Sequence, residues 1–288
     1  MAEEAKLAKD FASLESKIAK ATVSLNSAKT RLEKEEQKEA KKREKDQVSK
    51  QRTTDESIAN LQGNVRDVSR AQSKLERRVS RLETLPDKIT VLYLTAVPDK
   101  VGNIRTDREA REIRDAITRA LHRDSINFET RAAVRTSDLF QALNETQPTI
   151  VHFSGHGTTS GELVFEDSQG NPKCIAAEKM AAALETMADS VRLAVFNACF
   201  SETQAIEVVG SIEAAIGMGD SIDDATAIEF ASQLYSAIGF GLSLEKAFEQ
   251  ARVAIDLAGL PGSDTPELFV ADGVSASDVV YVNAEAVC

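Results

Sequence analysis

Two short segments decide the fold: residues 150–157 read IVHFSGHG, and residues 193–201 read LAVFNACFS. Each begins with a run of β-branched, aliphatic and aromatic residues and closes on small or polar ones, as a buried strand of a parallel sheet does. His156 therefore follows one strand, and Cys199 follows the other. Because the carboxyl ends of parallel strands form the crevice where ligands bind, we expect this imidazole and this thiol to meet there.

Strands and helices alternate from residue 88 onward. The expected strands cover residues 88–95, 126–133, 150–153, 193–196, 212–217, 268–270 and 279–282. The expected helices cover residues 107–122, 137–144, 176–187, 202–209, 223–238 and 244–257, and residues 161–172 form a small hairpin. This alternation predicts an α/β fold in which helices cover both faces of a mainly parallel sheet.

Charge divides the chain into two parts. Residues 1–87 carry 20 Lys and Arg against 16 Asp and Glu, whereas residues 88–288 carry 15 against 30. We therefore expect a helical coiled-coil arm at residues 1–86 and a globular domain at residues 87–288. The acidic domain disfavours nucleic acid as a partner and favours cationic ligands.

The arm shows two apolar seams with heptad spacing. The first is Leu7, Phe11, Leu14, Ile18, Leu25 and Leu32, and the second is Ile58, Leu61, Val65, Val68, Leu75, Val79 and Leu82. Between them, Thr53-Thr54-Asp55-Glu56 resembles a capping box, which favours two helices folded as a hairpin over a single rod. Each seam needs a partner, which is either its mate, a second copy of the chain or a regulatory protein.

Three cysteines, Cys174, Cys199 and Cys288, stand at no metal-like spacing, so we expect neither a disulfide framework nor a metal site. We expect no cofactor either. The acidic N-terminus has no signal-peptide character, and no run is long enough to span a membrane. The expected location is the reducing cytoplasm.

The strand-end residues have the chemistry of nucleophilic catalysis. Cys199 read alone is a small buried hydrophobe, but with a base beside it the thiol becomes a nucleophile. His156 lies between two glycines beyond its strand and is the better general base, whereas His152 lies inside the strand as a core histidine. The backbone N–H groups of Gly157 and Cys199 are expected to form an oxyanion hole.

Residues 88 to about 272 resemble a CHAT domain, a bacterial branch of the caspase, separase and gingipain clan of cysteine proteases. The resemblance rests on the two segments above, on the opening strand and on the strand Ala215-Ile216-Gly217-Met218. It implies a caspase-like α/β/α sandwich and peptide-bond hydrolysis by Cys199, with His156 as acid and base. The Gln-Ala-Cys-Arg/Gln-Gly pattern of animal caspases is replaced by Asn197-Ala198-Cys199-Phe200, so their basic substrate pocket is not implied.

Specificity is expected to come from an aspartate after the strand at 212–217. In separases an aspartate in a similar segment recognises arginine before the scissile bond, and Asp220 stands at the matching place here. Asp223 is the second candidate, although it also suits the N-cap of the following helix. The expected partner is a protein substrate with a basic cleavage site.

The sequence thus predicts a cysteine endopeptidase that cuts after Arg or Lys and is controlled through its arm. The resemblance implies a regulated effector in bacterial immunity, including antiviral defence, or in programmed cell death. The alternative is a catalytically silent adaptor of the same fold that acts through the arm. A nucleotide-binding protein is a third hypothesis, but no glycine-rich loop follows the first strand, where residues 95–99 read TAVPD.

Overall fold

The computed structural model describes residues 2–83, 86–98 and 101–283. The chain divides into two compact units, Met1–Glu76 and Arg77–Cys288. The boundary expected from the sequence lies later, at Pro86, just beyond the end of the long N-terminal helix.

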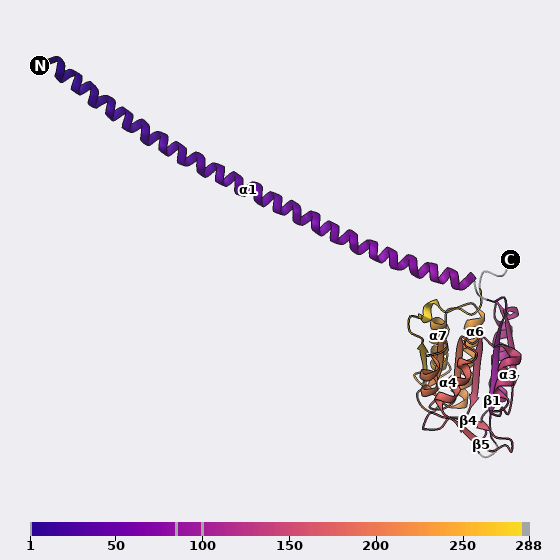
Figure 1. Ribbon diagram of the computed structural model, residues 1–288. Helices are drawn as coiled ribbons and strands as arrows, with labels where there is room; N and C mark the ends of the chain where they lie inside the picture. Colours follow the sequence, from indigo (N-terminus) through magenta and orange to yellow (C-terminus); the bar gives the residue numbers. More distant parts are fainter. Residues whose placement is uncertain (1, 84–85, 99–100, 284–288) are drawn as a thin grey trace. The chain divides into compact units, whose positions relative to one another are not determined.

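The first 83 residues contain one helix, α1 (Ala2–Glu83), which Figure 1 shows without interruption. The predicted hairpin is wrong, because the backbone of residues 53–56 is helical. A capping box ends the preceding helix only where its first residue leaves the helical conformation. No proline precedes Pro86 to enforce such a break, and the segment is rich in Lys, Glu, Gln and Ala, which favour helix.

The second unit is built on a six-stranded sheet with the order β2-β1-β3-β6-β7-β8. The strands are β1 (Ile89–Ala96), β2 (Ile126–Arg131), β3 (Ile150–Gly155), β6 (Leu193–Asn197), β7 (Ala214–Met218) and β8 (Pro266–Val270). All neighbouring pairs are parallel except β7 with β8, which is antiparallel. The predicted, mainly parallel sheet is confirmed.

Six helices cover the two faces of this sheet. Residues of α2 (Thr106–Arg119), α6 (Asp224–Gly239) and α7 (Leu244–Leu257) share one buried cluster with Val91 and Tyr93. Residues of α3 (Leu139–Thr146), α4 (Ala177–Glu185) and α5 (Glu202–Val208) share the other with Leu92 and Leu94. Alternate residues of a strand point to opposite faces, so this division makes a three-layer α/β/α sandwich.

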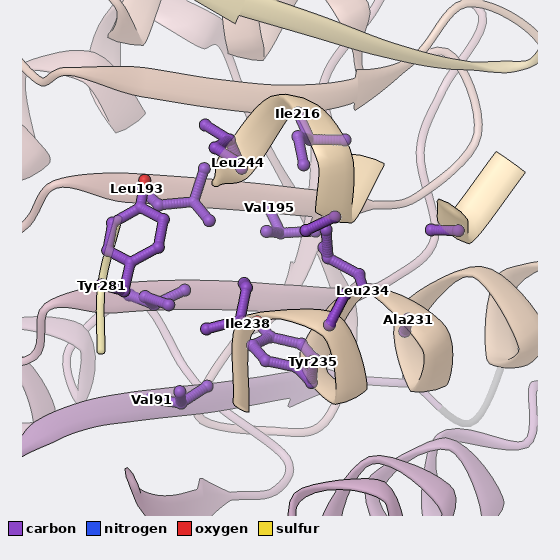
Figure 2. Packing of buried hydrophobic residues seen from close by; sticks show 14 of the residues in the cluster. Val91, Leu193, Val195, Ile216, Ala231, Leu234, Tyr235, Ile238, Leu244 and Tyr281 are labelled. Atoms are coloured by element: carbon purple, nitrogen blue, oxygen red, sulfur yellow. The ribbon is translucent and has the colours of Figure 1, made fainter. Parts of the chain in front are cut away.

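The first of these clusters forms the larger core. Figure 2 shows Leu193, Val195 and Ile216 of the sheet packed beside Leu234 and Ile238 of α6. All five side chains are buried. Burying a side chain of this size contributes about 1.5–3 kcal/mol, so this layer holds α6 firmly over the strand ends that it covers.

Smaller elements complete the second unit. The predicted hairpin is present as β4 (Leu163–Glu166) paired antiparallel with β5 (Pro172–Ile175), and single 3-10 turns lie at η1 (Arg123–Ser125) and η2 (Ala276–Asp278). The predicted strand at residues 279–282 is wrong, because that segment pairs with no strand. Its run of apolar residues reflects burial in the first cluster, and the Val279 carbonyl accepts a hydrogen bond from Leu244 N.

Among the described helices, none is long and apolar enough to cross a membrane.

Candidate active site

The two segments that open the sequence analysis end side by side. β3 and β6 are parallel neighbours in the sheet, and Ser154 pairs with Asn197 at their carboxyl ends. His156 and Cys199 each follow two residues later, and both line one cavity. Residues at the start of α2 and of α6 form the rest of that cavity.

The imidazole of His156 is oriented by a backbone carbonyl. Its Nε2 lies 3.1 Å from the Gly102 oxygen. A carbonyl only accepts, so Nε2 carries the ring proton, and Nδ1 of the neutral ring keeps the lone pair that a general base needs. The backbone of His156 is fixed from the other side, where its carbonyl accepts from Val164 N of β4 at 3.0 Å.

Cys199 is partly buried on a tight turn. Ile222 N donates to its Sγ at 3.5 Å, and the thiol donates to the Ile222 carbonyl at 3.9 Å. The next residue, Phe200, has φ 57°, a left-handed conformation rare for a side chain of this size. Phe200 N donates to the Asp220 carbonyl at 3.2 Å, which holds the strained turn in place.

Gly157 lies directly against the backbone of Cys199. A Cβ atom at position 157 would collide with the Cys199 carbonyl oxygen and lie 3.2 Å from its nitrogen. Among the described residues, the N–H groups of Gly157 and Cys199 donate to no acceptor. Two neighbouring donors beside a nucleophile are the arrangement that stabilises an oxyanion.

The two aspartates expected to set specificity follow β7, and the Asp220 carbonyl contacts the turn that carries Cys199. Asp220 accepts from Ser221 N at 2.6 Å through its own side chain, and Asp223 is the N-cap residue of α6. Neither is among the residues that line the cavity. The acidic residue of this segment that does line it is Asp224, whose Oδ2 accepts from Arg105 N at 3.1 Å.

The sequence analysis missed Glu109, a second carboxylate that lines the cavity. Glu109 belongs to α2 and is buried among polar groups of β3 and β6. A signal was present in the sequence, because Glu109 precedes Ile113 and Ile117 at four-residue spacing, on the apolar face of the helix.

The other candidate residues are separate from this cavity. His152 is a buried core histidine, as predicted, and bonds Tyr235 and Glu109. Cys174 is exposed in β5, and Cys288 lies outside the described residues. Within the described ranges, no group of three His, Cys, Asp or Glu side chains is arranged to hold a metal ion.

Comparison with known proteins gives the family. No curated protein matches the chain. Among solved structures, caspase-1 from Spodoptera frugiperda has 9% identity and a TM-score of 0.45, covering 69% of this chain and 91% of that one. Pyridoxal kinase from Lactobacillus plantarum has 12% identity and a TM-score of 0.29, covering 64% and 94%. The family model of the CHAT domain matches residues 18–258, most of the sequence, and the chain therefore belongs to the CHAT domain family.

Proposed function

We propose that this protein is a cysteine endopeptidase that cuts protein substrates after a basic residue. Cys199 is the nucleophile, and His156 is the acid and base. The observation that carries the proposal is the shared cavity at the ends of β3 and β6, lined by both side chains. A thiol and an imidazole within one cavity are the minimum for nucleophilic cleavage of an amide.

The proposed reaction follows the geometry of these groups. His156 Nδ1 accepts the thiol proton, and the sulfur attacks the scissile carbonyl carbon. The N–H groups of Gly157 and Cys199 donate to the resulting oxyanion. His156 then gives the proton to the leaving amine, which departs and leaves a thioester on Cys199. A water molecule, deprotonated by His156, hydrolyses the thioester and restores the thiol.

Charge supports a basic substrate residue. The cavity is lined by the carboxylates Glu109 and Asp224, and residues 88–288 carry 30 acidic against 15 basic side chains. A carboxylate binds a guanidinium or ammonium group through charge-assisted hydrogen bonds, which are about twice as strong as neutral ones. The acidic surface also raises the local concentration of basic peptides.

Cleavage of peptides with Arg or Lys at the scissile position tests this function. The wild-type protein cleaves after the basic residue, and Cys199→Ala removes the activity, because among the described residues no other thiol lines the cavity with His156. Cys174→Ala is the matched control and keeps activity within about twofold, since surface substitutions far from a site have small effects. Cleavage that survives Cys199→Ala contradicts the proposal.

We also propose that the enzyme is a regulated effector in the cytoplasm, in bacterial immunity or programmed cell death. Membership of the CHAT family and the exposed apolar seam of α1, which suits a controlling partner, support this role. Cells expressing the wild-type protein should accumulate fragments that end in Arg or Lys. Cells expressing Cys199→Ala should not, and identical fragment sets would count against it.

A non-catalytic adaptor is the second candidate. One observation favours it: apolar residues such as Phe11, Ile18 and Leu25 stay exposed along α1 and offer a binding surface. If binding to partners and the cellular effect persist unchanged in Cys199→Ala, the adaptor hypothesis replaces the enzyme.

A further inference from the structure

One wall of the cavity beside Cys199 is the buried carboxylate of Glu109, which is only 4% exposed. Its Oε1 accepts from Asn197 Nδ2 at 2.7 Å and is 3.0 Å from His152 Nε2, and its Oε2 accepts from Ser154 Oγ at 2.5 Å. Within the described part of the chain, no Lys or Arg forms an ion pair with this carboxylate. A buried charge is stable only where hydrogen bonds or an opposite charge compensate it.

The hydrogen bonds around His152 fix which ring nitrogen carries the proton. Burial, and after it the charge of Glu109, raise the pKa of the Tyr235 hydroxyl well above its ordinary value. Tyr235 therefore stays protonated, and its hydroxyl oxygen lies 3.0 Å from His152 Nδ1. His152 Nε2 faces Glu109 Oε1, which accepts, so this nitrogen carries a ring proton and donates it. Asn197, Ser154 and His152 thus supply the three donors to Glu109, and among the described residues no Lys or Arg pairs with it.

Asn197 adds an unused acceptor to the same cavity. Its Nδ2 donates to Glu109 and, at 3.2 Å, to the Ala227 carbonyl, so two acceptors fix the orientation of the amide. Its Oδ1 is buried and has no hydrogen-bond partner within the described ranges. A buried acceptor without a donor is unfavourable, and a ligand with N–H groups would satisfy it.

The Glu109 carboxylate and Asn197 Oδ1 are held close in register to the proposed catalytic residues, His156 and Cys199. Ser154, which holds Glu109, and Asn197 are paired across β3 and β6, two residues before His156 and Cys199. The lone cation on the cavity wall, among the residues described, is Arg105. Its Nε is 3.1 Å from Asp107 Oδ1, and its side chain is 60% exposed, so it is already paired on the outer surface.

We infer that Glu109 and the Asn197 Oδ1 atom recognise the cationic side chain of the substrate residue that precedes the scissile bond. This rests on the proposed function and names the residues that set its specificity. A guanidinium has five N–H donors and no acceptor, which complements a carboxylate and an amide oxygen. An ammonium has three donors without the planar fork, so Arg is preferred over Lys.

The test compares the rates at which peptidyl chloromethyl ketones alkylate Cys199, read by mass spectrometry on the full chain. The peptides end in Arg, in Asp, or in citrulline, which has the shape of Arg without its charge. Each rate is divided by that of chloroacetamide on the same variant, which corrects for changes in thiol reactivity. We expect Arg to exceed citrulline by about 30-fold or more in the wild type, equivalent to about 2 kcal/mol.

Variants then identify the residue responsible. In Glu109→Gln the ratio of Arg to citrulline falls to within about threefold of one, because the charge is lost with little change in size. Ser154→Ala removes one donor to Glu109 but keeps the charge, and it retains most of the preference. The wild-type ratio is measured without any substitution, so it tests the cation preference even if Glu109→Gln fails to fold, and a ratio that survives in Asp224→Asn then leaves Glu109 as the carboxylate of the cavity that recognises the cation.

Five results overturn the inference. A wild-type ratio near one, with Cys199 still labelled faster than Cys174, removes the cation preference and leaves the protease intact. If the ratio of the Arg rate to the citrulline rate is preserved in Glu109→Gln, Glu109 only supports the structure. If that ratio is lost only in Asp224→Asn, Asp224 recognises the cation. Faster labelling by the Asp peptide assigns it to Arg105. Equal labelling of Cys199 and Cys174 by every peptide overturns the proposed function itself, and the inference with it.

Discussion

Helices α6 and α1 carry the same kinds of apolar residues and differ in what surrounds them. In α6, Phe230 and Leu234 are fully buried between the sheet and its neighbouring helices. In α1, Phe11 and Leu25 are 67% and 69% exposed. Apolar periodicity therefore predicts that a helix has an apolar face. It does not show which surface covers that face.

This difference separates two kinds of stability in one chain. The second unit buries its apolar residues within itself, so its fold depends on its own packing. The seam of α1 gains nothing from the hydrophobic effect until another apolar surface covers it. Heptad spacing makes a second α1 the simplest such surface, since both helices then supply the same complementary seam.

The second unit, Arg77–Cys288, is called the body from here on. The largest effect expected from a substitution in the body is at Gly157. Gly157→Ala forces a Cβ against the Cys199 carbonyl and moves a donor of the proposed oxyanion hole. Loss of one such donor lowers kcat by about 100-fold or more. Gly210→Ala is the control, because its Cβ would meet only Glu207 O at an ordinary 3.6 Å. Peptide hydrolysis measures both, and equal kcat values would remove Gly157 from the site.

A Leu→Ala substitution in α6 and another in α1 test directly whether the two helices differ in what buries them. Leu234→Ala in α6 should lower the free energy of unfolding of the body by about 2–5 kcal/mol, because it opens a cavity in the core. Leu25→Ala in α1 should change it by less than about 0.5 kcal/mol. The protein has three Tyr and no Trp, and all three Tyr are buried in the body, so Tyr fluorescence during urea unfolding reports that unit alone. Equal losses in the free energy of unfolding for the two variants would contradict the difference between α6 and α1.

Self-association through α1 should depend on the seam. Leu25→Ser is expected to raise the dissociation constant of a dimer about tenfold, equivalent to about 1.4 kcal/mol. Val23→Ser changes a neighbouring residue that is equally exposed but lies off the seam, and it should change the constant by less than threefold. Sedimentation equilibrium of the full chain measures both. A monomer at every concentration would exclude a second copy as the partner.

The smallest effect concerns how helices of the body end. Gln147 follows α3 with φ 41° and ψ 58°, a left-handed conformation that favours glycine. Gln147→Gly should therefore raise the free energy of unfolding by about 0.5–1 kcal/mol. Gln141→Gly, inside the same helix, should lower it by about 1 kcal/mol. The same fluorescence measurement separates them, and a loss of stability at Gln147 would show that its side chain matters more than its backbone.

Much of the body could be predicted from the sequence because its signals are local. The α7 boundaries match the prediction because Leu244–Leu257 follows helical periodicity and begins after Ser243, whose hydroxyl accepts from Lys246 N. The placement of His156 and Cys199 on one cavity also follows from local signals. Both residues come directly after buried strands, and parallel strands bring their carboxyl ends to one edge.

The errors arise where a local pattern has two physical origins. The apolar run Val279-Val280-Tyr281-Val282 predicts a strand, but burial of a segment without strand pairing produces the same kind of run. His122 stands among charged residues, a context typical of solvated side chains, yet it is only 3% exposed, and its backbone N–H donates to the Gly239 carbonyl of α6. Glu109 belongs here too, because its partners come from two strands distant in sequence.

The parallel pairing of β3 with β6 makes the site independent of the length of chain that joins the two strands. Cys199 is positioned by register, so residues inserted at the Gly170 turn of the β4–β5 hairpin would lengthen a surface loop and leave the thiol in place. Deleting a single residue within β6 would instead rotate Asn197 to the opposite face of the sheet. The fold thus tolerates insertions in the loops between the two segments that carry His156 and Cys199. It tolerates almost no insertion or deletion within those segments themselves.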